Sequence, residues 1–437
     1  MKNILNPTPE LLANKFSLDC LEISFRRRSE PEGPKISGAG VLCQNQDSRL
    51  TLKAFPTENV PRWIYSNHER TPGKLYSDDD YFDIEITSYM GEKFLIERED
   101  INTSGYFGAA GDVATIQAYP KTIKYVYEHD EPSQKQTILY VVPEQLDLPY
   151  RPSAGNLTSQ FDKINVEFSV SQESTSILFS SESELDEKDT TILMHAIFIY
   201  SGKYIEPIFF KKRILTKSYC EIYSPQEKTN SRKFPKFNDN RFKPDFVNFL
   251  EGYLHLGRET DHGFFKYWRG CYLAWQKGVE TTCLPVSVYI EGIVNELYPS
   301  LTTQDQSVHD SVEMVIRQIS KMELSEEIQQ RLESSIKNMK NASARQALKK
   351  LKEQGIVTSS MIKHYVDLRN KSAHAEQKLS NTESDIQNMF SRLFSCITMQ
   401  YVLLLSRIGY TGVYLDRSVL GFPQKKMDKG RPAKINT

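Results

Sequence analysis

The stretch INVEFSV at residues 164–170 places an apolar side chain at every second position, with polar side chains between them. Successive side chains of an extended chain point to opposite faces, so this alternation predicts a strand with one buried face. The stretches FDIEI at residues 82–86 and LTLKA at residues 50–54 show the same period. Short turn segments separate such stretches from about residue 20 to residue 222, which predicts an antiparallel β-sandwich or open barrel.

Two longer apolar runs close this β-rich region, at residues 191–200 and 204–210. The segment SGK at residues 201–203 has the composition of a short turn that joins antiparallel strands. We therefore predict that both runs are strands. The second run is expected to be an edge strand or a bulged one, because Pro207 cannot donate a backbone hydrogen bond. His195 lies inside the first run and is expected to be a core histidine.

The apolar period changes from two to 3.6 after about residue 240, which predicts helices. A capping box, TESD at residues 382–385, precedes a continuous apolar stripe that reaches Ile397. The predicted helices cover residues 244–256, 262–277, 285–297, 308–322, 325–354, 360–369 and 382–408. The expected fold class is therefore α+β with segregated halves. A β-rich domain at residues 1–235 precedes an all-α bundle at residues 236–437, which ends in a basic tail.

The composition is that of a soluble globular chain, with 55 Lys or Arg residues against 56 Asp or Glu residues among 437. The net charge of −1 means that any basic surface is local. The six cysteines form no C-x-x-C pair, which argues against a zinc site or a disulfide framework and favours a reducing compartment. The longest strongly apolar stretch, residues 401–405, is far shorter than the roughly 20 residues that a bilayer requires. We expect a cytoplasmic protein that has no membrane contact.

A local basic stretch lies at residues 211–243, where ten Lys or Arg residues and three acidic residues are interleaved with aromatic rings. Rings can stack on bases while cations neutralise phosphates, so Lys233, Lys236 and Arg241 are candidate RNA-binding residues. The alternative is a solvated connector whose aromatic residues dock on either domain.

The signatures of most catalytic classes are absent. The chain has no Walker-type loop, no G-x-S-x-G and no H-E-x-x-H. The stretch GYFGAAG at residues 105–111 lacks the lysine and serine that end a phosphate-binding loop, so it predicts a turn. We expect neither a metal site nor a cofactor.

The segment MIKHYVDLRNKSAHA at residues 361–375 carries the strongest chemical signal. On the predicted helix, Arg369 falls on the same face as apolar Ile362, so its guanidinium needs an acid, a carbonyl or an anionic ligand. His374 follows five residues later, about 140° around an unbroken helix. The two side chains can converge only if the helix is interrupted or a second chain contributes. Asn370 and Ser372 are of types favoured at helix boundaries, which favours an interruption there.

Arginine and histidine without metal ligands or a nucleophilic serine suit metal-independent cleavage of RNA. A neutral imidazole can remove the proton from a ribose 2′-hydroxyl, and a guanidinium can stabilise the extra charge on the phosphorus. Such a reaction leaves a 2′,3′-cyclic phosphate and spares DNA, which lacks the hydroxyl.

The motif Arg369-Asn370-x-x-x-His374, at the end of a helix in an all-α domain, resembles the R-[polar]-x3-to-4-H signature of the HEPN superfamily (higher eukaryotes and prokaryotes nucleotide-binding domain). The stretch YIEGI at residues 289–293 is similar to the apolar-acidic-apolar pattern of an early HEPN helix. The resemblance covers roughly residues 245–410. The order of parts, a β-rich half before a C-terminal HEPN domain, is similar to that of ApeA-like antiphage proteins.

This resemblance implies a homodimer, or a higher even oligomer, in which Arg369 and His374 of two chains meet in one cleft that cuts single-stranded RNA. Transfer RNA is one candidate substrate. Arg369 would bind the phosphate, His374 would act as base or acid, and Asn370 would orient one of these groups, with Lys371 as a neighbouring RNA contact. By the same resemblance, the β-rich half senses a phage protein or restrains the nuclease of an abortive-infection effector.

Two other interpretations stay open. A HEPN-type domain that keeps its arginine and histidine for packing or dimerisation would be an interaction module that binds a protein or RNA partner. A helical scaffold unrelated to HEPN domains would have no role with RNA.

Overall fold

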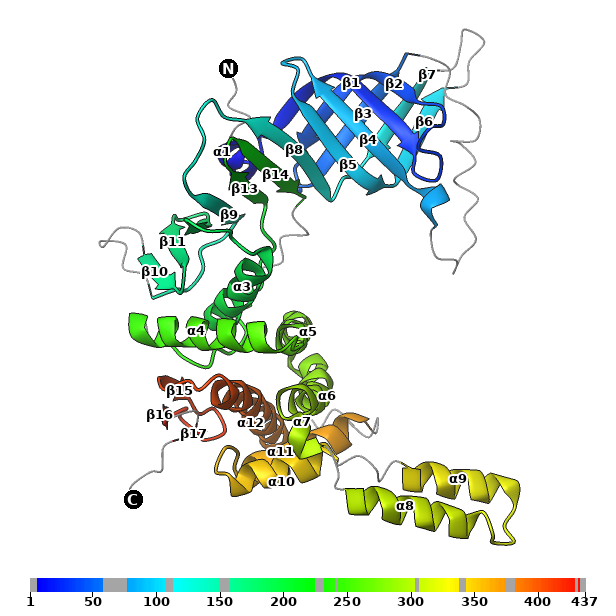
Figure 1. Ribbon diagram of the computed structural model, residues 1–437, viewed down its shortest axis with the longest axis vertical. Coiled ribbons are helices and arrows are strands. Elements are labelled where there is room, and N and C mark those ends of the chain that lie inside the picture. Colours follow the sequence, from blue (N-terminus) through cyan, green and yellow to red (C-terminus); the bar gives the residue numbers. More distant parts are fainter. Residues whose placement is uncertain are drawn as a thin grey trace. The chain divides into compact units, whose positions relative to one another are not determined.

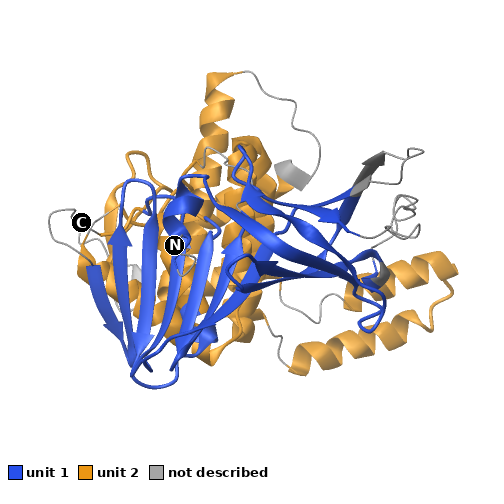
Figure 2. Ribbon diagram, turned by 90° about the horizontal axis from the view of Figure 1, so that it is seen from above, with its two compact units in different colours: residues 1–146, 150–190, 205–230 blue, residues 147–149, 191–204, 231–437 orange. Residues whose placement is uncertain are grey.

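The computed structural model describes residues 6–57, 77–106, 113–149, 157–224, 232–239, 242–302, 306–337, 343–373, 382–428 and 431–432. The chain forms two compact units, which Figure 2 shows in different colours. Unit 1 comprises residues 1–146, 150–190 and 205–230, and unit 2 comprises residues 147–149, 191–204 and 231–437. Unit 1 is built mainly from antiparallel strands and unit 2 mainly from helices, which confirms an α+β protein with segregated halves.

Unit 1 contains one antiparallel sheet of fourteen strands among its described residues, which Figure 1 shows in blue to green. The strands are β1 (Ser17–Arg27), β2 (Ile36–Gln44), β3 (Leu50–Pro56), β4 (Phe82–Ser88), β5 (Lys93–Glu99), β6 (Ile101–Tyr106), β7 (Val113–Ala118), β8 (Thr122–Glu128), β9 (Gln136–Val142), β10 (Leu157–Phe161), β11 (Ile164–Val170), β12 (Thr175–Ser181), β13 (Phe209–Ile214) and β14 (Lys217–Tyr223). Their order across the sheet is β10-β11-β12-β9-β13-β14-β8-β5-β4-β1-β2-β3-β7-β6. A short helix, α1 (Thr8–Leu12), precedes the sheet.

The predicted alternation produces the buried face of this sheet. Ile164, Val166 and Phe168 of β11 are buried, and the polar residues between them are not. Strands β1 to β8 contribute their apolar side chains to one core, which residues such as Phe209 of β13 and Ile222 of β14 complete. Because one face of so many strands meets in a single core, the sheet curls around a shared interior.

The prediction of a strand at residues 191–200 is wrong, because these residues form most of helix α3 (Glu187–Ser201). A continuous apolar run does not distinguish a buried strand from a helix that is buried on most sides. The helix begins where Asp186 Oδ1 accepts the Lys188 N–H at 2.8 Å, and it ends before Gly202, whose φ is 69°. Of the second run, only Phe209 and Phe210 lie in a strand.

Unit 2 contains helices α4 (Lys243–Glu259), α5 (Phe264–Lys277), α6 (Val279–Leu297), α7 (Pro299–Thr302), α8 (Gln306–Ile319), α9 (Glu326–Lys337), α10 (Ala344–Glu353), α11 (Ser359–Ala373) and α12 (Glu383–Arg407). The single helix predicted at residues 325–354 is two helices, α9 and α10. A capping box between Ser343 and Gln346 starts the second of these. The basic tail, from Pro423 on, contributes β16 (Gln424–Asp428) and β17 (Arg431–Pro432) to a small sheet with β15 (Val413–Leu415).

Residues 191–204 belong to unit 2, although the chain on both sides of them belongs to unit 1. The ring of Tyr200 in α3 meets the rings of Phe237 and Phe246 edge to face, with centroids 5.5 Å and 4.8 Å away. The imidazole of His195 stacks on Phe265 with a centroid distance of 3.7 Å. The end of α3 is therefore a core element of the helical unit.

Helix α12 is long and apolar enough, by length and composition alone, to cross a membrane. However, 67% of its most apolar window is buried inside the structure. Helix α12 therefore packs as a core helix of its unit.

Candidate functional site

The candidate catalytic segment lies at the end of α11, which packs against α6 and α12. The buried side chains of Met361, Tyr365 and Leu368 hold one face of α11 in the bundle. Arg369 follows that face and its side chain is 40% exposed, while Asn370 is exposed. The helix continues through Asn370 and Ser372 to Ala373, so the predicted interruption at these two residues is wrong.

Arg369 contacts the carboxylate of Glu291 on α6. Arg369 Nε lies 2.8 Å from Glu291 Oε1, and the hydroxyl of Tyr365 donates a hydrogen bond to the same oxygen at 2.7 Å. Burial, followed by this hydrogen bond, raises the pKa of Tyr365, which keeps the phenol protonated as a donor. This contact confirms that the guanidinium, placed beside an apolar face, meets an acid.

Glu291 lies in the YIEGI stretch, but its pairing with Arg369 was not predicted. The neighbouring Ile290, Ile293 and Val294 are buried, and Glu291 sits at the border of that apolar stripe with a side chain that is 30% exposed. An acidic residue beside an apolar helix stripe is a signal for a charge partner. The sequence does not show which distant cation supplies it.

Several predicted site residues cannot be placed. His374 and Arg241 lie outside the described residues, and so does the side chain of Lys371. The meeting of Arg369 and His374 at one phosphate therefore stays a prediction.

A second polar contact joins α11 to α12 on the turns before Arg369. Asp367 Oδ2 lies 3.9 Å from Arg392 Nε. The neighbouring His364 is partly buried, and its Nδ1 has no hydrogen-bond partner within the described part of the chain. Burial lowers the pKa of His364, and the charge of Arg392 lowers it further, so a neutral ring is favoured.

Lys233 and Lys236, predicted to bind RNA, both contact Asp147. Their Nζ atoms lie 3.1 Å and 2.8 Å from Asp147 Oδ2, and the side chain of Lys236 is only 10% exposed. Burial alone would raise the pKa of the Asp147 carboxyl, but the two ammonium groups outweigh it and hold that pKa below its usual range. Phe234 and Phe237 are buried in the same unit, as the docked-connector alternative predicts for its aromatic residues. The role of the two lysines with RNA stays a prediction.

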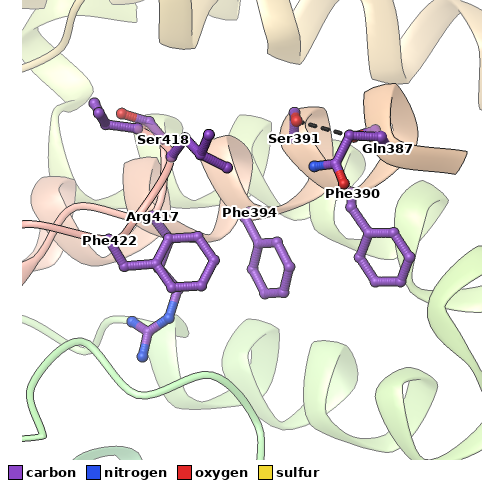
Figure 3. Close-up of a pocket in the computed structure, with 9 residues that line it drawn as sticks. Gln387, Phe390, Ser391, Phe394, Arg417, Ser418 and Phe422 are labelled. Atoms are coloured by element: carbon purple, nitrogen blue, oxygen red, sulfur yellow. Dashed lines mark hydrogen bonds between the residues drawn. The ribbon is translucent and has the colours of Figure 1, made fainter. Parts of the chain in front are cut away.

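A groove of about 350 Å³ lies over α12 and the segment that follows β15. Figure 3 shows the rings of Phe390, Phe394 and Phe422 in a row along it, beside Arg417. The Arg417 guanidinium donates a hydrogen bond to the Lys236 carbonyl oxygen. Because Arg417 is held in this way and is largely buried, it is a structural cation, and the groove offers mainly apolar surface.

Metal-ligating side chains do not gather in the described part of the chain, where no three His, Cys, Asp or Glu residues are placed to hold an ion. No family model, curated protein or solved structure matches this chain. The basis for a functional proposal is therefore the chemistry of the side chains on α6 and α11.

Proposed function

We propose that this chain is a metal-independent endoribonuclease of the HEPN type, with Arg369 as the phosphate ligand and His374 as the residue that transfers protons. The observation that supports it is the contact of Arg369 with Glu291 and, through that carboxylate, with Tyr365. This contact fixes a partly exposed guanidinium at the end of α11, five residues before His374.

The contact with Glu291 orients Arg369 without using up its capacity to bind phosphate. A guanidinium carries five N–H donors in a planar fork, and the contact at Nε occupies one of them. With its side chain 40% exposed, Arg369 can present other donors to a phosphate. A guanidinium that is already held in place stabilises developing charge with little loss of side-chain freedom.

The remaining steps fall to His374 and Asn370. The neutral imidazole takes the proton of the 2′-hydroxyl, the 2′-oxygen bonds to the phosphorus, and the bond to the 5′-oxygen breaks. That imidazolium, or a protonated His374 of a second copy, supplies the proton that the leaving 5′-oxygen needs. Asn370, which is exposed beside Arg369, can donate its amide hydrogens to a phosphate oxygen.

The biological setting belongs to the same proposal. A β-rich unit that precedes a ribonuclease suits a cytoplasmic antiphage effector in which unit 1 senses a phage component or restrains cleavage. Single-stranded RNA, including exposed loops of transfer RNA, is the substrate class that such a centre would take.

A second candidate is supported by the same geometry. The contacts of Glu291 with Tyr365 and Arg369 also join α6 to α11. An ion pair and a hydrogen bond between two helices stabilise a bundle whether or not RNA binds. In that case the helical unit would be a catalytically inactive interaction module.

The decisive experiment incubates the purified full chain with total RNA in the presence of EDTA, beside the Arg369→Ala and His374→Ala variants. Lys363→Ala is the matched control, because it removes an exposed cation from the same helix. Cleavage that survives chelation, leaves 2′,3′-cyclic phosphate ends and is lost only in the first two variants supports the nuclease. The same RNA cleavage pattern from the wild type and all three variants would reject the nuclease and favour the interaction module.

A further inference from the structure

A cluster of basic side chains lies on one face of the sheet in unit 1, on the neighbouring strands β13, β14 and β8 (Figure 1). Across these strands Arg213 pairs with Ser218, and Ser218 pairs with Tyr127. Directly paired residues of antiparallel strands point to the same face, and so does every second residue along a strand. Lys211 therefore shares the face of Arg213. His129, the residue after β8, reaches the same face, because its Nε2 lies 2.8 Å from Ser218 Oγ.

This face is the one that carries the core of unit 1. Ile222, on the same face of β14, is buried in that core, and Tyr127 packs against it. The rings of Tyr127 and His129 are tilted against each other, with centroids 4.9 Å apart. Lys211, Arg213 and His129 are each only partly exposed. The cluster therefore lies at the edge of an apolar core, where charges are screened less than on an open surface.

Among the described residues, neither Arg213 nor Lys211 forms an ion pair with a carboxylate. Arg213 Nη2 donates a hydrogen bond to the Glu131 carbonyl oxygen at 2.9 Å, and its Nε lies 3.5 Å from the Leu215 carbonyl oxygen. Lys211 Nζ lies 5.3 Å from the centroid of the Tyr127 ring. Carbonyl oxygens and an aromatic ring orient the two cations, but they leave both positive charges without a counter-ion.

The cations on the opposite face of β13 and β14 are paired. Lys212 Nζ lies 2.5 Å from Glu187 Oε1, and Lys217 Nζ lies 3.5 Å from Glu128 Oε1. In the part of the sheet that the structure describes, carboxylates thus neutralise the cations of one face and not those of the other. Two uncompensated positive charges at alternate positions of one strand repel each other, and an anion bound beside both would remove that repulsion.

We propose that Lys211, Arg213 and His129 form a binding site for a phosphate group, either free phosphate or the phosphate of a small molecule. A guanidinium has five N–H donors, of which the two carbonyl contacts use two, and an ammonium group has three. An imidazole that accepts the Ser218 hydroxyl at Nε2 can donate from Nδ1. Donors from β13 and from the end of β8 suit a tetrahedral anion, which accepts hydrogen bonds on several sides, better than a planar carboxylate.

The site belongs to unit 1 and uses no residue of α6 or α11, so it does not depend on the proposed nuclease. Binding can therefore be measured without RNA and without any cleavage assay.

Bound phosphate should raise the pKa of His129. In the free chain, partial burial and then the charges of Arg213 and Lys211 lower this pKa, while the exposed Asp130 carboxylate acts against them. An anion beside the ring favours its charged form, and we expect a rise of about 0.5 or more. The Cε1–H NMR signals of histidine, followed over a pH series with and without phosphate at constant ionic strength, measure the change. The His129 signal is the one that disappears in His129→Gln.

Isothermal titration calorimetry of the full chain with inorganic phosphate and with adenosine 5′-monophosphate provides the second test. Lys211→Met/Arg213→Gln removes both cations, and we expect the dissociation constant of each ligand to rise at least about 10-fold. Lys212→Met/Lys217→Met removes the same charge from the opposite face and should leave the constants nearly unchanged. Tighter binding of the nucleotide than of inorganic phosphate would show that the site takes a phosphate carried by a small molecule. Equal binding would show that it recognises the phosphate group alone.

A wild-type chain that binds neither ligand would overturn the proposal. So would equal weakening by the two double variants, because attraction to net charge alone would then explain the binding. Phosphate binding that leaves the pKa of His129 unchanged would place the anion elsewhere and would also overturn it. Circular dichroism verifies that each variant folds. If Lys211→Met/Arg213→Gln does not fold, the pKa of His129 in the wild-type chain still decides the question.

Discussion

Arg369 Nε lies 2.8 Å from Glu291 Oε1, so the candidate phosphate ligand on α11 is held by a carboxylate from α6. Seventy-eight positions separate the two residues in the sequence, and only the packing of the two helices brings them together. A carboxylate in this position restricts the guanidinium and also reduces its net charge. Any phosphate that binds Arg369 must therefore share it with Glu291.

Replacing Glu291 by glutamine tests that shared contact. Glu291→Gln keeps the shape of the side chain but loses the charge that holds Arg369, and we expect RNA cleavage to fall about 10- to 100-fold through a misplaced guanidinium. The loss should appear mainly in kcat, with a small change in KM, because the remaining charge still attracts RNA. Glu280→Gln, at an exposed position in the first turn of α6, is the control and should cleave normally. A Glu291→Gln variant with full kcat would remove the positioning role.

The contact of Asp147 with two lysines predicts an acid-sensitive stability. The pKa of this carboxyl is lower in the folded chain than in the unfolded chain, so its stabilisation is complete above the unfolded value and is lost as the pH falls through the folded value. Asp147→Asn should lower the free energy of unfolding at neutral pH by about 1 to 3 kcal/mol. Its difference from the wild type should shrink in strong acid. Thermal unfolding over a pH series, with exposed Asp130→Asn as control, measures both effects.

Burial of His195 predicts a second pH dependence of stability, at higher pH than that of Asp147. Burial, with smaller effects from His262 and Arg269, lowers the pKa of His195 to about 4. In the unfolded chain the imidazole of His195 binds a proton near pH 6.5, whereas in the folded chain it stays neutral until about pH 4. The free energy of unfolding therefore falls as the pH drops from about 6.5 to about 4. His195→Leu should flatten this part of the profile, whereas exposed His255→Leu should not. Chemical denaturation at several pH values provides the measurement, and parallel profiles for His195→Leu and the wild type would contradict the expectation.

The end of α3 should be required for the helical unit to fold. A fragment of residues 231–437 lacks Tyr200 and therefore leaves the rings of Phe237 and Phe246 without one of their packing partners. We expect this fragment to aggregate or to lose cooperative unfolding, and a peptide of residues 185–207 added in trans to restore part of its stability. Calorimetry of the fragment with and without the peptide, beside a peptide of scrambled order, tests this. A sharp transition of the fragment alone would show that α3 is dispensable.

Local sequence patterns predicted the elements whose burial is one-sided. The alternation at residues 164–170 became β11, and α12 begins at the predicted cap residue Thr382, whose side chain accepts the Asp385 N–H. Residues 191–200 were misassigned because α3 is buried on most sides and therefore shows no clear period. Patterns of this kind indicate how much of an element is covered, but they do not identify what covers it.

Some site residues could likewise be found from a local pattern, whereas their partners could not. Arg369 was found because a charged side chain beside an apolar helix face is costly without a partner. Its partner Glu291, and the pairing of Lys233 and Lys236 with Asp147, depend on contacts between distant segments that leave no local pattern. The RNA-binding role predicted for the two lysines rested on their charge and on the aromatic rings interleaved with them, whereas their availability depends on a carboxylate more than eighty positions away.

The path of the chain through α3 also constrains how the protein can evolve. Residues 191–204 leave the strand-rich unit, complete the aromatic core of the helical unit, and the chain then returns to add β13 and β14 to the sheet. A recombination event near residue 230 would give the bundle a foreign upstream half and remove one of its own helices. The two halves of this gene must therefore be inherited together, and a helical half joined to another N-terminal module would first need a replacement for that helix.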